Sequence, residues 1–485
     1  MKKFLSVLLA LMLALGAVVP AFAHSVQEAG ECNELPVVIV RGMDFTGLYI
    51  DYGTENQRST LAKIEVSDIL GCLTRAVVKS ILNFSTDPAI DEIIDYVDYV
   101  LDGYAMNIDG SSKHNVGYKK YPQSAENYED LVNGGGNETG MARACIEQLP
   151  AGHTYYFNYD WRADPLEVAD GINELVNTAL RETGHDKVKI VCSSMGGIMT
   201  VAYLTKYGYD KVERCLFMSS TFCGAQVASD LLCGKIDITA ENLYNFLSDL
   251  TSDNKALSLL IKSLKVAGAF SAVTKLTDYV IENYQDEIYE RVLTPVFGHM
   301  LTLWGLVQPE DFDEAIEYMF GDSKEENAAF IKKAQALQNM MNNRDALLKK
   351  MMADGVKIAV VCAYDSPVVP AYENADFTGD GVLETYQMSG YATVAKYGET
   401  LGEDYTPIKA KYLSPDRAVD LSTALFPDHT YIIKNAPHVS CSYGTDYNDF
   451  FMWLLTAQGD FYAGVNPKYP QFMQSDKAQT LKAFE

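Results

Sequence analysis

The chain has 485 residues, of which 48% are hydrophobic and 21% are charged, so it can bury a large core and is not compositionally disordered. Its 65 acidic residues outnumber its 39 basic residues, and the formal net charge of −26 argues against binding to nucleic acid. An anionic membrane would also repel such a surface, so we expect any lipid contact to be local and apolar.

The first 23 residues have the three parts of a secretory signal peptide. Lys2 and Lys3 precede an apolar run, and the small-residue segment Ala-Phe-Ala ends at Ala23. No later stretch has the roughly 18 to 20 consecutive apolar residues that cross a bilayer, and no cysteine directly follows Ala23 to accept a lipid anchor. We therefore expect residues 1–23 to be removed and the product to be secreted.

Short runs rich in Val, Ile and Tyr predict buried β-strands. They lie at residues 36–40, 154–159, 187–192, 212–218, 356–362 and 430–434. A helix that opens with Asp164 and Pro165 and closes at Gly184 is predicted between the second and third strands, and another from Met195 to Tyr207 after the third. This alternation predicts the α/β class, with a mainly parallel sheet flanked by helices.

Two long segments interrupt the alternation. The first, about 53–150, combines amphipathic stretches with a loose polar part from Asn107 to Gly140, and the second, 221–355, has helical patterns and no convincing strand. We expect the second to form a large helical cap on a core made of 24–220 and 356–485, with a separate domain as the alternative. Apolar cap residues such as Trp304 are expected either to line an acyl pocket over the site or to pack in the cap's own core.

The nine cysteines have no metal-ligand spacing, and because their number is odd at least one thiol stays free in a monomer. Cys223 and Cys233 are the nearest pair and are the candidates for a disulfide. Cys192, Cys215 and Cys362 lie in strand-like runs, where we expect cysteine to be buried as a small apolar residue. We expect no metal and no cofactor.

The third predicted strand runs into Cys192-Ser193-Ser194-Met195-Gly196-Gly197 and then directly into a helix. A serine at such a turn has its Oγ above the sheet, and the next backbone N–H points at a developing oxyanion. Aligning the two glycines makes Ser194 the nucleophile. Ser193 is the alternative, because Cys192 replaces the first glycine of the usual G-x-S-x-G pattern. A serine in an ordinary strand-helix connection is the non-catalytic interpretation.

His438 is the candidate general base. Of the seven histidines, it alone lies in the loop between the last predicted strand and the closing helical segment DYNDFFMWLLTA. In a triad with the chain order nucleophile, acid, histidine, the histidine follows the last strand. The alternative is a loop histidine with a purely structural role.

The acid of the triad has several candidates after the fifth predicted strand, among them Asp365 and Asp380. An acid is needed because it fixes the histidine tautomer and stabilises the imidazolium. The segment 376–381, with Asp376 and Asp380, also fits the first six positions of a calcium loop. Gln387 stands where the bidentate glutamate of such a loop belongs, which disfavours calcium.

The first predicted strand ends in a tight turn, Arg41-Gly42-Met43. A backbone N–H in this turn can supply the second donor of an oxyanion hole. We assign the oxyanion hole to the backbone N–H groups of Met43 and Met195. An ordinary turn glycine at Gly42 is the alternative.

The predicted core contains the motifs PVVIVRG, FNYDWRADPLEVA, KVKIVCSSMGG, GDGV and NAPHVS. Together they resemble the lecithin:cholesterol acyltransferase-like lipases of the α/β-hydrolase fold, and the Tyr-Asp-Trp-Arg segment is the most specific part. The resemblance covers mainly the sheet and favours Asp380, the aspartate of the G-D-G element, as the triad acid. The chain departs from the family at Cys192, at Arg41, where histidine is frequent, and in the long stretch from Asp380 to His438.

The resemblance and the site pattern predict a secreted serine hydrolase that cleaves carboxylic esters of acyl lipids with Ser194, His438 and Asp380. A phospholipase or lipid acyltransferase of the same fold is the alternative among enzymes, and a non-catalytic binding module is the alternative of another class. The expected partners are an ester or acyl-lipid substrate and a transient lipid surface at the cap. We expect no nucleic acid and no obligate protein partner.

Overall fold

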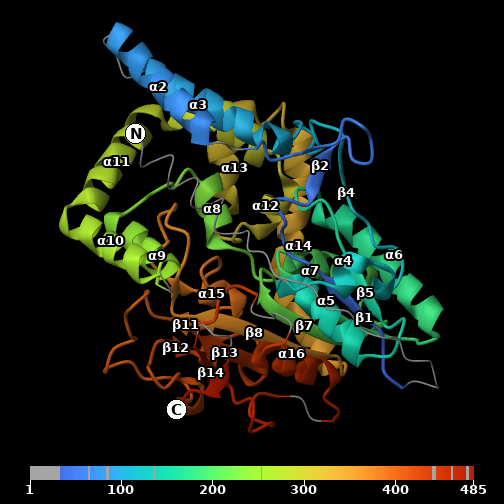
Figure 1. The fold of residues 1–485 in the computed structure, drawn as a ribbon. Helices are drawn as coiled ribbons and strands as arrows, with labels where there is room; N and C mark the ends of the chain where they lie inside the picture. The colour runs from blue at the N-terminus through green and yellow to red at the C-terminus, as the bar shows by residue number, and fades with distance from the viewer. Residues whose placement is uncertain are drawn as a thin grey trace.

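The computed structural model of the chain describes residues 33–63, 66–83, 87–135, 137–252, 254–439, 444–459, 462–476 and 480–485. The expected signal peptide and the cysteines Cys32 and Cys441 lie outside the described residues. An eight-stranded sheet forms the centre of the molecule, and helices cover both of its faces (Figure 1).

The central sheet has the strand order β15-β14-β13-β8-β7-β6-β1-β5. Its strands are β1 (Val37–Val40), β5 (Thr154–Phe157), β6 (Val188–Ser194), β7 (Val212–Ser220), β8 (Lys357–Tyr364), β13 (Thr430–Lys434), β14 (Phe472–Ser475) and β15 (Leu481–Ala483). Neighbouring strands are parallel except for β14 and β15, which pair antiparallel. The predicted strands are thus confirmed, whereas β14 and β15 at the sheet edge were not predicted.

Successive residues of the central strands are apolar because both faces of the sheet are buried. One face packs against α6 (Pro165–Thr183) and α7 (Gly196–Tyr207), and the other against α5 (Asn137–Gln148) and α16 (Asp446–Thr456). The predicted ends of α6 are confirmed. Asp164 accepts a hydrogen bond from the N–H of Leu166 at 2.9 Å, and Gly184 ends the helix with a φ of 75°.

The strands β1 and β6 are neighbours that lead to opposite faces of the sheet. The chain after β1 reaches β5 through α5, whereas β6 leads directly into α7 on the other face. The two strands end side by side, since Val40 of β1 pairs with Cys192 of β6. In open α/β sheets such a change of direction leaves a crevice at the carboxyl ends of the strands, where ligands bind.

The segment about 53–150 is more ordered than we expected. Next to β2 (Leu48–Ile50), it contributes strands and helices: β3 (Arg58–Ser59), α2 (Val66–Asn83), α3 (Asp87–Leu101), β4 (Val116–Tyr118) and α4 (Glu129–Val132). The part from Asn107 to Gly140 is not loose, because β4, α4 and the first turn of α5 lie within it. Leu131 in this part and Met141 just after it are both buried in the core on the α5 face of the sheet. This burial explains why the segment is ordered.

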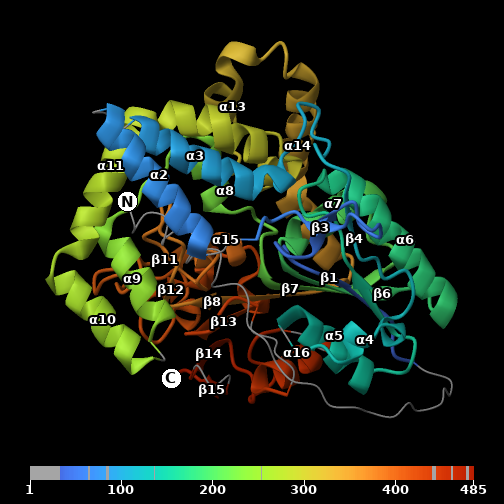
Figure 2. The ribbon, with the colours of Figure 1, turned by 45° about the horizontal axis from the view of Figure 1, so that its top comes forward.

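The segment 221–355 is helical and has no strand among its described residues. Its helices are α8 (Gln226–Leu232), α9 (Ala240–Leu250), α10 (Lys255–Val266), α11 (Ala269–Ile288), which continues as a π-helix (Tyr289–Gly298), α12 (Leu301–Leu306), α13 (Phe312–Phe320) and α14 (Ala328–Ala353). The helices α12 and α14 pack onto the α7 face of the core. The helices α9, α10 and α11 lie together on the side of the molecule away from α6 (Figures 1 and 2).

No single helix in the described ranges has both the length and the apolar composition of a membrane span. The bent pair Lys255–Val266 and Ala269–Gly298 meets these criteria only when its two parts are taken together.

The chain between β8 and β13 forms short elements at the carboxyl edge of the sheet. They are β9 (Ser366–Pro367), β10 (Thr378–Gly379), α15 (Thr385–Met388), β11 (Thr393–Val394) and β12 (Val419–Asp420). The strands β9 and β10 pair antiparallel. Asp380 follows β10 directly, so this hairpin determines where its carboxylate lies.

The cysteines of the described residues are buried free thiols, including Cys223 and Cys233, so this pair forms no disulfide. Burial raises the pKa of the thiols of Cys223 and Cys233 to about 12. Cys192, Cys215 and Cys362 are buried in the strands of the sheet, as their sequence context predicts.

Candidate active site

Ser194 lies at the sharp turn between β6 and α7, with a left-handed φ of 48°. Such a conformation is uncommon for a residue with a side chain and is found where the surrounding structure imposes it, often at functional sites. The carbonyl of Ser194 accepts hydrogen bonds from the N–H of Thr221 at 2.9 Å and from its hydroxyl at 3.1 Å. Ser194 is half-buried, whereas the neighbouring Ser193 is fully enclosed.

The two glycines after Ser194 allow α7 to approach the sheet closely. A Cβ at Gly196 would lie 2.3 Å from the carbonyl oxygen of Val40, and a Cβ at Gly197 would lie 1.9 Å from Oγ of Ser220. Neither distance is compatible with a side chain, so both positions require glycine. The turn after β1 therefore lies directly beside the first turn of α7.

Ser194, His438 and Asp380 form a continuous chain of hydrogen bonds. Oγ of Ser194 lies 2.9 Å from Nε2 of His438, and Nδ1 of His438 lies 2.7 Å from Oδ2 of Asp380. The Asp380 side chain is completely buried, and 18% of the His438 side chain is exposed. In this arrangement Nδ1 donates to the carboxylate, which leaves Nε2 free to accept the serine proton.

The backbone of the β10 hairpin fixes the carboxylate of Asp380. Oδ1 accepts hydrogen bonds from the N–H groups of Val382 at 3.0 Å and Leu383 at 2.8 Å. The N–H of Asp380 donates in turn to the carbonyl of Leu383 at 3.0 Å. One carboxylate oxygen is thus held by the turn, and the other faces His438.

The loop that carries His438 is also constrained. Asn435 and Val439, which flank the histidine, have φ values of 58° and 49°. A positive φ at a β-branched residue such as Val439 is a strained conformation that the surrounding fold must maintain. This loop aims the imidazole at Ser194.

The other acids that the sequence offers have different partners. The carboxylate of Asp365 lies 3.4 Å from the ammonium group of Lys434, which is also 2.7 Å from Asp416. Burial raises the pKa of Asp365, and the charge of Lys434 opposes this effect. Asp376 forms an ion pair with Lys396, so the two acids of the calcium-like segment pair with separate groups.

The backbone N–H groups of Met43 and Met195 are both without a hydrogen-bond partner among the described residues. Met195 directly follows Ser194. Met43 lies two residues after Arg41, whose carbonyl oxygen is close to Gly196 in the first turn of α7. A backbone N–H without an internal acceptor is suited to stabilise negative charge on a carbonyl oxygen, so both groups remain candidates for the oxyanion hole.

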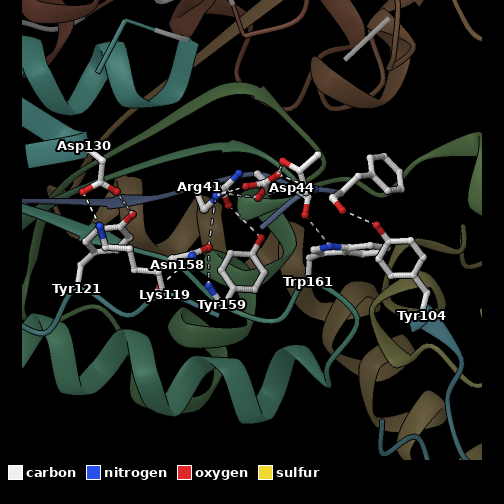
Figure 3. Close-up of polar contacts among 12 residues, drawn as sticks. Arg41, Asp44, Tyr104, Lys119, Tyr121, Asp130, Asn158, Tyr159 and Trp161 are labelled. Atoms are coloured by element: carbon white, nitrogen blue, oxygen red, sulfur yellow. Dashed lines mark hydrogen bonds and ion pairs between the residues drawn. The ribbon is translucent and has the colours of Figure 1, made fainter. Parts of the chain in front are cut away.

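The loop after β1 is held by the segment that follows β5 (Figure 3). The hydroxyl of Tyr159 donates to the carbonyl of Arg41 at 2.9 Å, and the indole N–H of Trp161 donates to the carbonyl of Asp44 at 3.0 Å. Arg41 and Asp44 also form an ion pair at 2.9 Å. The Tyr-Asp-Trp-Arg segment thus supports the backbone on both sides of Met43.

Asp44 is ionised in this loop. Burial favours its neutral form, but the charge of Arg41 and the hydrogen bonds from Thr46 outweigh burial, so the pKa of Asp44 lies below its ordinary value. Asp44 is therefore charged at neutral pH and can form the ion pair with Arg41.

Arg162, the last residue of the same segment, has a role that the sequence did not reveal. Its buried guanidinium bonds Asp160 through two nitrogens, at 3.0 and 2.7 Å, and donates to the carbonyl of Tyr104 at 3.2 Å. These hydrogen bonds hold the backbone just after α3 against the core. A bidentate arginine pair in a completely buried position is a rigid contact.

Glu384 is a second buried acid that our sequence analysis missed. It lies four residues after Asp380 and accepts a hydrogen bond from the hydroxyl of Tyr372, while its Oε2 has no partner among the described residues. Burial raises the pKa of Glu384 to about 7, although the Tyr372 hydrogen bond opposes the shift. The sequence shows Glu384 as an acid shortly after Gly-Asp-Gly, but nothing in the local pattern indicates that it is buried.

Trp304 does not line the site. Its indole is completely buried, stacks on Phe320 with ring centroids 5.4 Å apart, and donates to the carbonyl of Gly298 at 2.9 Å. Phe312 and Phe330 meet its edge. Of the two roles that we expected for this residue, the structure supports packing within the core.

No protein-family model matches the sequence, and no curated protein matches it. Among solved structures, a chain in the crystal structure of the Tle4-Tli4 complex is 11% identical, with 69% of this chain and 75% of that chain covered and a TM-score of 0.30. A TM-score of 0.30 establishes neither a common fold nor a common function.

Proposed function

We propose that this protein is a serine hydrolase of the α/β-hydrolase type that cleaves carboxylic esters through an acyl-enzyme. The observation that carries the proposal is the chain of hydrogen bonds from Ser194 through His438 to Asp380, with distances of 2.9 and 2.7 Å. The order serine, aspartate, histidine along the sequence is the order that α/β-hydrolases use. The location of Ser194 at the carboxyl end of β6, which pairs with β1, supports it further.

In the first half of the reaction, Oγ of Ser194 attacks the ester carbonyl carbon while Nε2 of His438 takes the serine proton. Asp380 stabilises the resulting imidazolium through Nδ1–H, and the N–H groups of Met43 and Met195 bind the oxyanion. When the tetrahedral intermediate collapses, His438 gives the proton to the departing alkoxide, which leaves as an alcohol. The acyl group stays on Ser194.

In the second half, His438 removes a proton from a water molecule, which attacks the acyl-enzyme carbonyl. Collapse of the second tetrahedral intermediate breaks the bond to Ser194 and releases a carboxylic acid, and His438 returns the proton to Oγ. The substrate class that we propose is acyl lipids, because the motifs PVVIVRG, YDWR, SSMGG, GDG and NAPHVS resemble those of lecithin:cholesterol acyltransferase-like lipases. We propose secretion as the destination on the basis of the N-terminal signal pattern.

A fluorophosphonate probe tests the proposal, because it reacts with an activated serine and with few other side chains. We expect the wild type and Ser193→Ala to be labelled and Ser194→Ala to be unlabelled, with a loss of ester turnover on the order of 10⁶-fold in the last. Ser193 is the matched control, since it is the adjacent serine and is enclosed in the strand. Circular dichroism of each variant would show that it is folded. Labelling of Ser194→Ala equal to the wild type would contradict the assignment.

A further inference from the structure

The helix α10 is amphipathic in an unusual way, because apolar side chains occupy two of its sides. Ile261 and Leu264 pack against the small cluster formed by Leu243, Phe270 and Val273. Leu259 and Val266 lie on the opposite side and are 67% and 91% exposed. Isolated apolar side chains are common on protein surfaces, but two at this exposure on one short helix form a distinct apolar site.

The same side of α10 carries positive charge. Four residues spaced by four, three and four positions form a single stripe along the helix: Lys255, Leu259, Lys262 and Val266. From Asn254 to Gly268 the sequence has three lysines and no acid, although the whole chain has a net charge of −26. The third lysine, Lys265, lies with its ammonium group 3.6 Å from the ring centroid of Tyr244.

We infer that α10 binds to an anionic lipid surface, with Leu259 and Val266 among the acyl chains and Lys255 and Lys262 at the head groups. A helix of 12 residues is about 18 Å long and lies flat in such an interface rather than crossing it. The acidic remainder of the protein does not prevent this contact, because salt screens charges beyond about 8 Å. In this proposal the contact is both apolar and electrostatic, whereas the composition of the whole chain predicts an apolar contact alone.

The position of α10 connects this surface to the candidate active site. The helix α9, which packs against α10, contacts β9, and β9 pairs with β10 directly before Asp380. The arm formed by α9, α10 and α11 is therefore attached at the sheet edge that carries the triad acid (Figure 2). The inference deepens the proposed function, because it names the surface on which an acyl-lipid substrate is met.

Flotation with vesicles tests the inference in the Ser194→Ala variant, which binds without turnover. The probes are vesicles of phosphatidylcholine alone and of an equimolar mixture of phosphatidylcholine and phosphatidylglycerol. We expect the Ser194→Ala protein to bind the anionic vesicles. Lys255→Gln/Lys262→Gln should reduce this binding about fivefold for each lysine. Leu259→Ser/Val266→Ser should reduce it at least about tenfold for each residue. Ile408→Ser is the matched control, because Ile408 is 73% exposed, is followed by a lysine and lies outside the arm.

Equal binding of the α10 variants, the control and the parent protein would overturn the inference, and so would absence of binding to the anionic vesicles. A concentration-dependent dimer that Leu259→Ser/Val266→Ser dissociates would also overturn it, because α10 would then contact a second copy of the chain. The same substitutions are also made in the protein that keeps Ser194, and these variants are treated with the fluorophosphonate probe. This labelling tests the proposed function separately from vesicle binding. Vesicle binding by a protein that the probe does not label would support the lipid surface and count against the hydrolase.

Discussion

Glu384 makes the stability of this protein depend on pH in a way that a single substitution tests. The folded state holds its carboxyl in a completely buried position, and burial raises the pKa of Glu384 from its ordinary 4.5 to about 7. Between these two pH values the folded protein binds more protons than the unfolded chain, so the free energy of unfolding falls as the pH rises. The difference between these two pKa values corresponds to about 3 kcal/mol of stability, which is present below pH 4.5 and is lost above pH 7.

Glu384→Gln removes this titration and keeps the shape of the side chain and an oxygen that accepts from Tyr372. The free energy of unfolding in urea, measured at several pH values between 5 and 8, gives the difference between the variant and the wild type. We expect that difference to shift by up to about 3 kcal/mol in favour of the variant as the pH rises across this range. A packing defect caused by the amide would change the difference by the same amount at every pH.

The matched control is Glu399→Gln, which removes a carboxyl from an exposed position. Its difference from the wild type, measured at the same pH values, is the reference for removal of an exposed carboxyl. If the difference for Glu384→Gln followed this reference at every pH, Glu384 would not change its protonation state in the folded protein between pH 5 and 8. The reasoning from burial would then be wrong.

Three further substitutions test the site and the segment 221–355. Asp380→Asn should lower the turnover of a chromogenic ester on the order of 10⁴-fold, because an amide does not hold the required tautomer of His438. Asp365→Asn loses only an ion pair with Lys434 and should lower turnover much less. The reverse ranking would make Asp365 the triad acid. Trp304→Ala should lower the free energy of unfolding by about 3 to 5 kcal/mol and leave the dependence of kcat/KM on acyl length unchanged. Unchanged stability with a changed acyl-length preference would instead return Trp304 to the substrate pocket.

The sequence predicted those parts of the fold in which local pattern and tertiary environment agree. The strands β1, β5, β6, β7, β8 and β13 are continuous apolar runs because they are buried on both faces, and that pattern is visible without a structure. The strands β14 and β15 at one end of the central sheet were missed, and so were the two- or three-residue strands β2, β3 and β4. Their length and half-exposed surroundings leave no periodic pattern to detect.

The candidate site likewise contains residues that the sequence predicted and residues that it did not. Ser194 and His438 follow from chain order and from the glycines that α7 needs, both of which are properties of the sequence. The choice between Asp380 and Asp365 depends on a hairpin turn that aims one carboxylate at His438 and on Lys434, which engages the other. Glu384 and Trp304 depend on long-range burial, which composition and spacing do not determine.

The hydrogen bond between Ser194 and His438 joins residues 244 positions apart, and β13 must enter the sheet before the histidine reaches the serine. A chain that is still being synthesised carries the serine but has no base to activate it. Under the proposed function, the capacity to hydrolyse esters begins only when β13 and the loop that carries His438 have assembled.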